Sequence, residues 1–122
     1  MATVLIVDDS NYTRRTHRRI LESAGHTVLE ADTGMAAIES YVVNRPDLVL
    51  LDLTMTDMSG LEVLEKLREL NPDVRVVVVS ADVQRSTAAL VADSGAMRFL
   101  GKPVAPPELL DTVRELMQDQ AK

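Results

Sequence analysis

Short apolar runs alternate with amphipathic segments along the whole chain. Most of the apolar runs end abruptly at a polar or turn-forming residue, which is typical of strands buried on both faces of a parallel sheet. The run ending at Asp52 is the clearest example, because four apolar residues precede one acidic residue. The predicted strands are residues 4–7, 27–31, 48–51, 74–79 and 97–100.

The segments between these strands repeat apolar residues at helical spacing and carry helix start and stop residues. Ser59 followed by Glu62 three residues later forms a capping box, and Gly25 is a typical residue after a helix end. The predicted helices are residues 11–24, 34–43, 60–70, 83–93 and 106–117. The inward face of the third helix is predicted to hold Leu61, Val63, Leu64 and Leu67.

Strand and helix therefore alternate five times, which favours parallel strands joined by right-handed crossovers. We expect an α/β fold with three layers, in which helices cover both faces of one sheet. The second strand is less apolar than the others and is expected nearer an edge. We expect a single domain over residues 1–122, with residues 119–122 as a frayed tail.

Composition narrows the function classes. Aromatic residues make up only 2% of the chain, so the core must be aliphatic, and the absence of cysteine excludes disulfides and thiolate metal ligands. We expect no secretory signal and no membrane insertion, because the apolar runs are short. A net charge of -6 disfavours direct nucleic-acid binding. These features favour a cytoplasmic protein.

Polar residues whose side chains can bind ligands or react follow four of the five predicted strands. Asp8 and Asp9 follow the first strand, Asp52 the third, Ser80 the fourth and Lys102 the fifth. The carboxyl ends of parallel strands lie at one edge of a sheet, where ligands bind in open α/β folds. We therefore expect these side chains to converge.

This set of residues is suited to phosphoryl transfer. Crowded carboxylates repel one another unless a cation neutralises them, and oxygen ligands without histidine or cysteine favour Mg²⁺, with Mn²⁺ as an alternative. An aspartate can accept a phosphoryl group covalently, and a lysine supplies further positive charge. Taken alone, Asp52 would more often cap a turn, and the acidic residues could form a solvated rim.

A basic run, Arg14-Arg15-Thr16-His17-Arg18-Arg19, is unusual in an acidic protein. It could dock an acidic kinase or phosphotransfer domain beside the active edge, or it could be an ordinary solvated helix face. His17 and His26 are interpreted as structural or solvent-facing residues rather than metal ligands.

Five short motifs, in order and each at a strand or helix end, resemble the receiver domain of two-component response regulators. The resemblance is to the chemotaxis-regulator (CheY-like) type and extends along the whole chain. It implies a flavodoxin-like, doubly wound five-stranded parallel sheet with strand order 2-1-3-4-5, present here as a stand-alone receiver. The motifs are Val7-Asp8-Asp9-Ser10, Asp47 to Leu53, Met58-Ser59-Gly60, Ser80-Ala81 and Lys102-Pro103.

The resemblance also implies residue roles. Asp52 would take a phosphoryl group from a phosphohistidine. Asp9, Asp52 and the backbone carbonyl of Thr54 would bind Mg²⁺ directly, with Asp8 acting mainly through water. Lys102 would contact the phosphoryl group, and its peptide bond to Pro103 would be cis.

The switch implied by the resemblance involves Ser80, which would bind a phosphoryl oxygen, and Phe99, which would follow it inward. This movement would rearrange the face formed by the fourth helix, fifth strand and fifth helix, where a downstream protein would bind. Thr54 and Asp82 occupy positions that vary in the family and are expected to modulate phosphate lifetime. The chain departs from the family at Thr56, where proline is usual, and at Phe99, where chemotaxis regulators often have tyrosine.

The sequence therefore predicts a signalling switch that catalyses only its own phosphorylation and dephosphorylation. Its expected partners are a sensor histidine kinase or a histidine phosphotransfer domain. Two alternative functions use related residues. A haloacid-dehalogenase-like phosphatase would need an acidic residue at Thr54 and a cap domain, and a flavin carrier would bind phosphate poorly beside Asp8 and Asp9.

Overall fold

The computed structural model describes residues 2–53, 57–81 and 96–120. Five parallel strands form one sheet in the order β2-β1-β3-β4-β5, as the resemblance implied. The strands and the four helices among the described residues are β1 (Thr3–Val7), α1 (Asn11–Ser23), β2 (Thr27–Ala31), α2 (Gly34–Asn44), β3 (Leu48–Leu51), α3 (Gly60–Leu70), β4 (Val76–Ser80), β5 (Arg98–Gly101) and α5 (Pro106–Gln120). The helix predicted over residues 83–93 lies outside the described residues.

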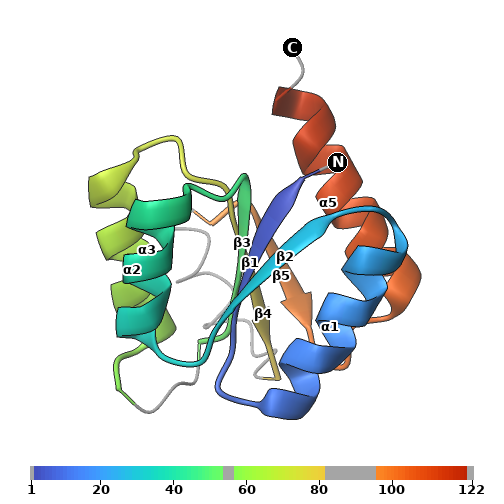
Figure 1. Ribbon diagram of the computed structural model, residues 1–122, viewed down its shortest axis with the longest axis horizontal. Coiled ribbons are helices and arrows are strands. Elements are labelled where there is room, and N and C mark those ends of the chain that lie inside the picture. Colours follow the sequence, from blue (N-terminus) through green and yellow to red (C-terminus); the bar gives the residue numbers. More distant parts are fainter. Residues whose placement is uncertain (1, 54–56, 82–95, 121–122) are drawn as a thin grey trace.

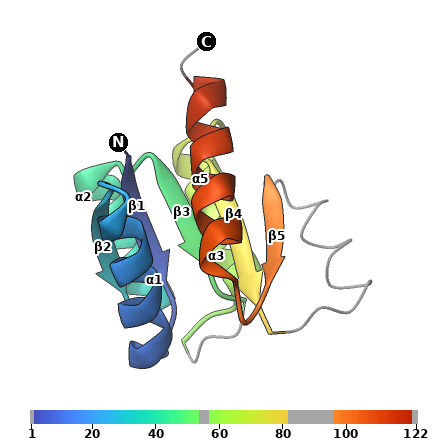
Figure 2. The same ribbon diagram turned by 90° about the vertical axis from the view of Figure 1, so that its right-hand side faces the viewer.

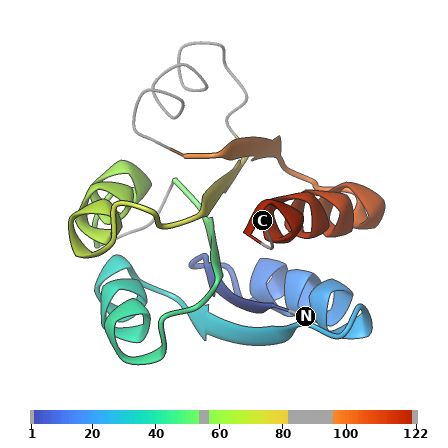
Figure 3. The same ribbon diagram turned by 90° about the horizontal axis from the view of Figure 1, so that it is seen from above.

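The sheet lies between two layers of helices. Helices α1 and α5 pack on one face, and α2 and α3 pack on the other (Figures 1 and 3). All carboxyl ends of the strands point toward the lower edge of Figure 2. The predicted α/β/α sandwich is confirmed, and β2 is an edge strand as its weaker apolar pattern indicated.

Alternation along each strand builds two separate cores. Val4 and Ile6 of β1 face the α1–α5 layer, whereas Leu5 and Val7 face the α2–α3 layer, because successive side chains of a strand point to opposite faces. The same alternation holds along β3. This two-sided burial explains why these strands are apolar at every position.

Helix ends follow the predicted capping chemistry. The Ser59 hydroxyl accepts a hydrogen bond from the Glu62 amide at 3.2 Å, and Gly25 adopts a φ of 89° just after α1. One prediction on α3 was wrong, because Leu61 is only half-buried. The buried stripe begins instead at Gly60 and continues through Val63, Leu64 and Leu67, which is the i, i+3, i+4, i+7 spacing of one helix face.

Several predicted boundaries were displaced, most by a single residue. Strand β4 begins at Val76 rather than at residue 74, because the Val74 amide donates to the Asn71 carbonyl in a turn instead of joining the sheet. Strand β5 is shifted by one residue, to Arg98–Gly101. Helix α5 continues to Gln120, so the tail expected from residue 119 is helical at its first two positions.

Candidate functional site

Asp8 and Asp52 lie side by side because β1 and β3 are neighbours in register. Val7 pairs with Leu51, and each of these residues directly precedes one of the two aspartates. The Asp52 amide donates to the Val7 carbonyl at 2.9 Å, and the Asp8 amide donates to the Ala31 carbonyl at 3.1 Å. The backbone hydrogen bonds of the sheet therefore fix the main-chain positions of both aspartates.

Asp8, Asp9 and Asp52 form the acidic cluster of this edge. One carboxylate oxygen from each lies within 4.8 Å of the others. Asp8 and Asp52 are only 3% and 4% exposed, whereas Asp9 is exposed. Carboxylates held this closely at a partly buried site favour binding of a cation.

Lys102 directly follows β5, and its side chain reaches the acidic cluster at the ends of β1 and β3. Its Nζ lies 2.7 Å from Oδ2 of Asp8 and 3.5 Å from Oδ2 of Asp52, and its side chain is 20% exposed. The Lys102 amide donates to the Ser80 carbonyl at 2.9 Å, and the Lys102–Pro103 peptide bond is cis, as the resemblance implied. One ammonium thus faces three carboxylates, which leaves the edge with excess negative charge.

The other predicted site residues fall into two groups. Ser80 is 1% exposed at the end of β4, and Phe99 is half-buried on β5, where it pairs in register with Val78. Ser80 is therefore on the same edge as Lys102. Thr54, Thr56 and Asp82 lie outside the described residues.

The start of α3 approaches the backbone of Asp52 closely. A Cβ at Gly60 would lie 2.6 Å from the Asp52 carbonyl oxygen and 2.6 Å from the Leu53 Cα. The Gly60 amide also donates to the Leu53 carbonyl at 3.1 Å. Only glycine fits this contact, which gives the Met58-Ser59-Gly60 motif a structural reason.

The basic run divides into two sets of arginines. Arg14 and Arg18 both pair with Glu30 on β2, and Arg18 also pairs with Glu22 at 3.2 Å. Hydrogen bonds from Arg18 hold the pKa of Glu30 below its usual value. Arg15 and Arg19 are exposed, and the described residues offer them no ion pair. Among the described residues, Arg15 and Arg19 are thus the arginines of the basic run whose charge is not used in an ion pair.

Neither histidine belongs to the acidic cluster, in keeping with their interpretation as structural residues. His17 is buried on α1, where burial and then the charge of Lys102 lower its pKa. It lines a cavity of about 390 Å³ beside Lys102. His26 accepts a hydrogen bond from the Ala2 amide at 3.1 Å through Nδ1.

Sequence reasoning named Arg14 only as part of the basic run and did not single out Asp57, so it missed the contacts of both residues near the acidic cluster. Arg14 donates to the Asp8 main-chain carbonyl, and the Asp57 carboxylate accepts from the Gly34 and Met35 amides. Those amides lower the pKa of Asp57. Both contacts join residues on different elements, so no local spacing could have indicated them.

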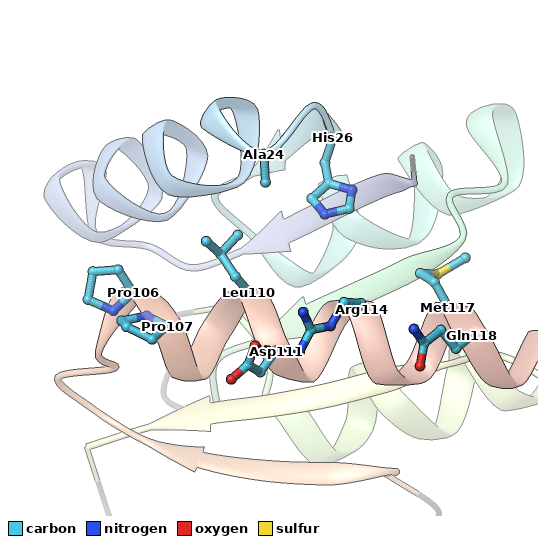
Figure 4. Close-up of a pocket in the computed structure, with 9 residues that line it drawn as sticks. All are labelled: Ala24, His26, Pro106, Pro107, Leu110, Asp111, Arg114, Met117 and Gln118. Carbon is cyan, nitrogen blue, oxygen red and sulfur yellow. Dashed lines mark hydrogen bonds and ion pairs between the residues drawn. The ribbon is translucent and has the colours of Figure 1, made fainter.

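A second, larger cavity of about 760 Å³ lies between α5 and the turn that follows α1, and it is shown in Figure 4. Its lining is mainly apolar and includes Pro106, Leu110 and Met117, but no member of the acidic cluster. The charged side chains Asp111 and Arg114 on its rim pair with each other at 2.8 Å. This cavity is therefore separate from the acidic cluster and from Lys102.

Comparison with known proteins identifies the family. The response regulator receiver domain family matches residues 4–114. The chain belongs to this family. Receiver domains are signalling switches of two-component systems.

Relatives and solved structures agree with this assignment. The chain is 32% identical over 114 residues to the chemotaxis protein CheY of Thermotoga maritima, with 93% of this chain and 95% of that protein covered. It is 37% identical to the response regulator MprA of Mycobacterium sp. strain KMS over 94% of this chain, and there it spans only 50% of the relative's length.

A CheY-like receiver domain protein from Methanospirillum hungatei JF-1 has a closely similar structure. The TM-score is 0.94 at 29% identity, and the alignment covers 99% of this chain and 97% of that one. This similarity confirms the flavodoxin-like, CheY-like receiver fold. Among the described residues, we find no helix with the length and hydropathy needed to cross a bilayer.

Proposed function

We propose that the chain is a phosphoacceptor switch in which Asp52 takes a phosphoryl group from a phosphohistidine. The donor would be a sensor histidine kinase or a histidine phosphotransfer protein in the cytoplasm. The observation that carries this proposal is the position of the Lys102 ammonium, which contacts Asp8 and Asp52 beside the three-carboxylate cluster. Family membership supports the same role.

The proposed step is a direct displacement at phosphorus. An Asp52 carboxylate oxygen attacks the phosphorus, a P–O bond forms, and the P–N bond to the donor imidazole breaks. A phosphoimidazole protonated on its second nitrogen leaves as a neutral ring, so Asp52 need not supply a proton. Lys102, already 3.5 Å from Asp52, would contact the oxygens of the transferring group and offset their charge.

The donor set of the acidic cluster fits a hard divalent cation. It offers only oxygen atoms, and its net charge is negative even with Lys102 present. Asp9, Asp52 and the Thr54 carbonyl would hold Mg²⁺, or Mn²⁺, directly. Asp8 would act mainly through water, as in the family that the chain belongs to; its two oxygens accept from the Ser10 amide and from Lys102. When bound there, a divalent cation would supply positive charge that offsets the charge of the phosphoryl oxygens.

Output would depend on the residues beside the acceptor. Ser80, at the same edge, would bind a phosphoryl oxygen, and Phe99 would move inward with it. The rearranged face, made by residues 83–93, β5 and α5, would bind a downstream protein. Thr54 and Asp82 would modulate the lifetime of the phosphorylated state. No direct contact with nucleic acid and no membrane insertion are part of this proposal.

Two other functions are disfavoured by particular residues. Phosphatases that use an aspartate nucleophile need an acid two residues later, where this chain has Thr54. A flavin carrier would place its phosphate near Asp8 and Asp9, whose charges would repel it.

The deciding experiment is incubation with a small acyl phosphate, with and without Mg²⁺, followed by intact-protein mass measurement. We expect one added phosphoryl group that requires Mg²⁺ and is absent from the Asp52→Asn variant. The proposal would be overturned if the Asp52→Asn variant gained the phosphoryl group, or if the wild type gained none. Steady turnover of a generic phosphate ester or a yellow protein would instead favour the phosphatase or the flavin carrier.

A further inference from the structure

The guanidinium of Arg14 lies directly behind the acidic cluster and contacts three elements. It donates to the main-chain carbonyl of Asp8 at 2.5 Å, to the Asn11 side chain at the start of α1, and to Oε1 of Glu30 on β2 at 3.0 Å. Its side chain is only 11% exposed. Arg14 therefore joins the end of β1, the first turn of α1 and the neighbouring strand.

We propose that Arg14, oriented by Glu30, is a positioning residue that holds the Asp8–Asp9 turn in the geometry required for cation binding. The inference rests on the proposed function, because it assigns Arg14 a task in building the metal site. A planar guanidinium with five N–H donors suits this task, because it can bind several acceptors in fixed directions.

The contacts of Asp8 explain how the Arg14 side chain can restrain the whole Asp8–Asp9 turn. Its carbonyl accepts from Arg14 on one side, and its Oδ1 accepts from the Ser10 amide at 2.8 Å on the other. These bonds fix the peptide units on both sides of Asp9, the exposed carboxylate of the acidic cluster. Loss of the Arg14 contact would free the turn while leaving every carboxylate in the sequence.

The charge of Glu30 complements this role. A lone arginine behind three carboxylates would compete with the incoming cation for negative charge. Glu30 offsets that charge, and Arg18, which also contacts Glu30, is offset by its second partner Glu22. The Arg14–Glu30 pair can thus restrain the backbone without adding net positive charge next to the acidic cluster.

The neighbouring arginines provide matched controls. Arg19 lies on the same helix, is exposed, and has no ion pair with the residues that the structure describes. Its replacement removes the same charge from α1 but no contact with the Asp8 turn. A difference between the Arg14 and Arg19 variants therefore reports the contacts of Arg14 rather than the charge of the helix.

The test compares Arg14→Met, Arg14→Lys and Arg19→Met with the wild type at a temperature where thermal melts show all four to be folded. Calorimetric titration with Mg²⁺ should show binding weakened by roughly tenfold in Arg14→Met, a size typical of residues that orient metal ligands. In the metal-free protein, hydrogen exchange of the Ser10 amide should accelerate several-fold. Arg14→Lys should recover part of both losses, and Arg19→Met should match the wild type.

Unchanged Mg²⁺ affinity and unchanged Ser10 exchange in Arg14→Met would overturn the inference. If that variant does not fold, Glu30→Gln replaces it and is expected to show the same two changes at smaller size; unchanged values there would overturn the inference as well. Absence of Mg²⁺ binding by the wild type would instead refute the proposed function, while the metal-free exchange measurement would still judge the role of Arg14.

Discussion

The carboxylate of Asp57 accepts a hydrogen bond from the Gly34 amide at 2.9 Å, although 23 residues separate the two along the chain. A second bond reaches Asp57 from the Met35 amide at 3.1 Å. Both amides belong to the first turn of α2, where helix N–H groups lack partners within the helix. Asp57 thereby ties the segment that follows Asp52 to α2, in a chain that has Thr56 where the family usually has proline.

Replacing Asp57 with asparagine should destabilise the fold at neutral pH and reduce its sensitivity to acid. The pKa of Asp57 is lowered below its usual 3.8 by the Gly34 and Met35 amides, so its contribution to stability is present above that pH. The contribution is lost as the pH falls through the lowered pKa. Urea unfolding at pH 7 and pH 3 measures this.

The control for this prediction is Asp32→Asn, because Asp32 is an exposed aspartate next to α2. We expect the stability gap between wild type and Asp57→Asn to narrow at pH 3. A gap of equal size at both pH values would show that the charge of Asp57 contributes nothing.

Replacing Lys102 with methionine should separate metal binding from phosphoryl transfer. The ammonium lies 2.7 Å from Asp8 and competes with a cation, so its removal should tighten Mg²⁺ binding about threefold to tenfold, roughly 1 kcal/mol. Phosphorylation by an acyl phosphate should slow by about tenfold or more. Lys66→Met, an exposed change on α3, should alter neither rate nor affinity. Weaker Mg²⁺ binding in Lys102→Met would contradict this electrostatic account.

Replacing Asp52 with asparagine should stabilise the metal-free protein by about 1 kcal/mol. Three carboxylates face one ammonium at this edge, and the variant removes one negative charge while keeping an oxygen acceptor. Saturating Mg²⁺ should raise the melting temperature of the wild type more than that of the variant, because a ligand stabilises the state that binds it. Equal melting temperatures without metal would show that repulsion at the acidic cluster is negligible.

Replacing His26 with asparagine should flatten the dependence of stability on pH between about 7.5 and 5.5. Burial, and then the charge of the N-terminus, lower the pKa of His26 from 6.5, and its Nδ1 must stay unprotonated to accept from Ala2. The neutral ring therefore contributes stability above pH 6.5, and this is lost as the pH falls through the lowered pKa. Asparagine keeps an acceptor but does not titrate. Urea unfolding of both proteins across this pH range measures the effect. The prediction would be refuted if the unfolding free energy of the variant depended on pH as steeply as that of the wild type.

Charge reversal at Arg15 and Arg19 tests whether α1 docks an acidic donor. Arg15→Glu with Arg19→Glu should slow transfer from a cognate phosphohistidine protein several-fold, with a weaker effect at high salt, but leave phosphorylation by an acyl phosphate unchanged. Arg14 and Arg18 are unsuitable for this test, since their replacement breaks the pairs with Glu30. Equal slowing with both donors would indicate a damaged fold instead of a lost docking surface.

The sequence alone determined the layers of the fold and the location of its chemistry. Apolar runs such as residues 48–51 predicted strands buried on both faces, and their alternation with helical segments predicted parallel strands covered by helices. Since the carboxyl ends of parallel strands share one edge, Asp8, Asp52 and Lys102 were predicted to meet there, and they do. Local capping chemistry also located the start of α3 at Gly60.

Only the tertiary structure decided which neighbours support that edge. The sequence offered four similar arginines on α1, but packing against β2 buries Arg14 beside Glu30 and leaves Arg19 exposed. It likewise could not show that Asp57 binds the amides of α2, or that the contact of Asp52 with α3 requires glycine at residue 60. These contacts join residues that are distant along the chain, and their partners are set by how the elements pack, for which local residue patterns carry no information.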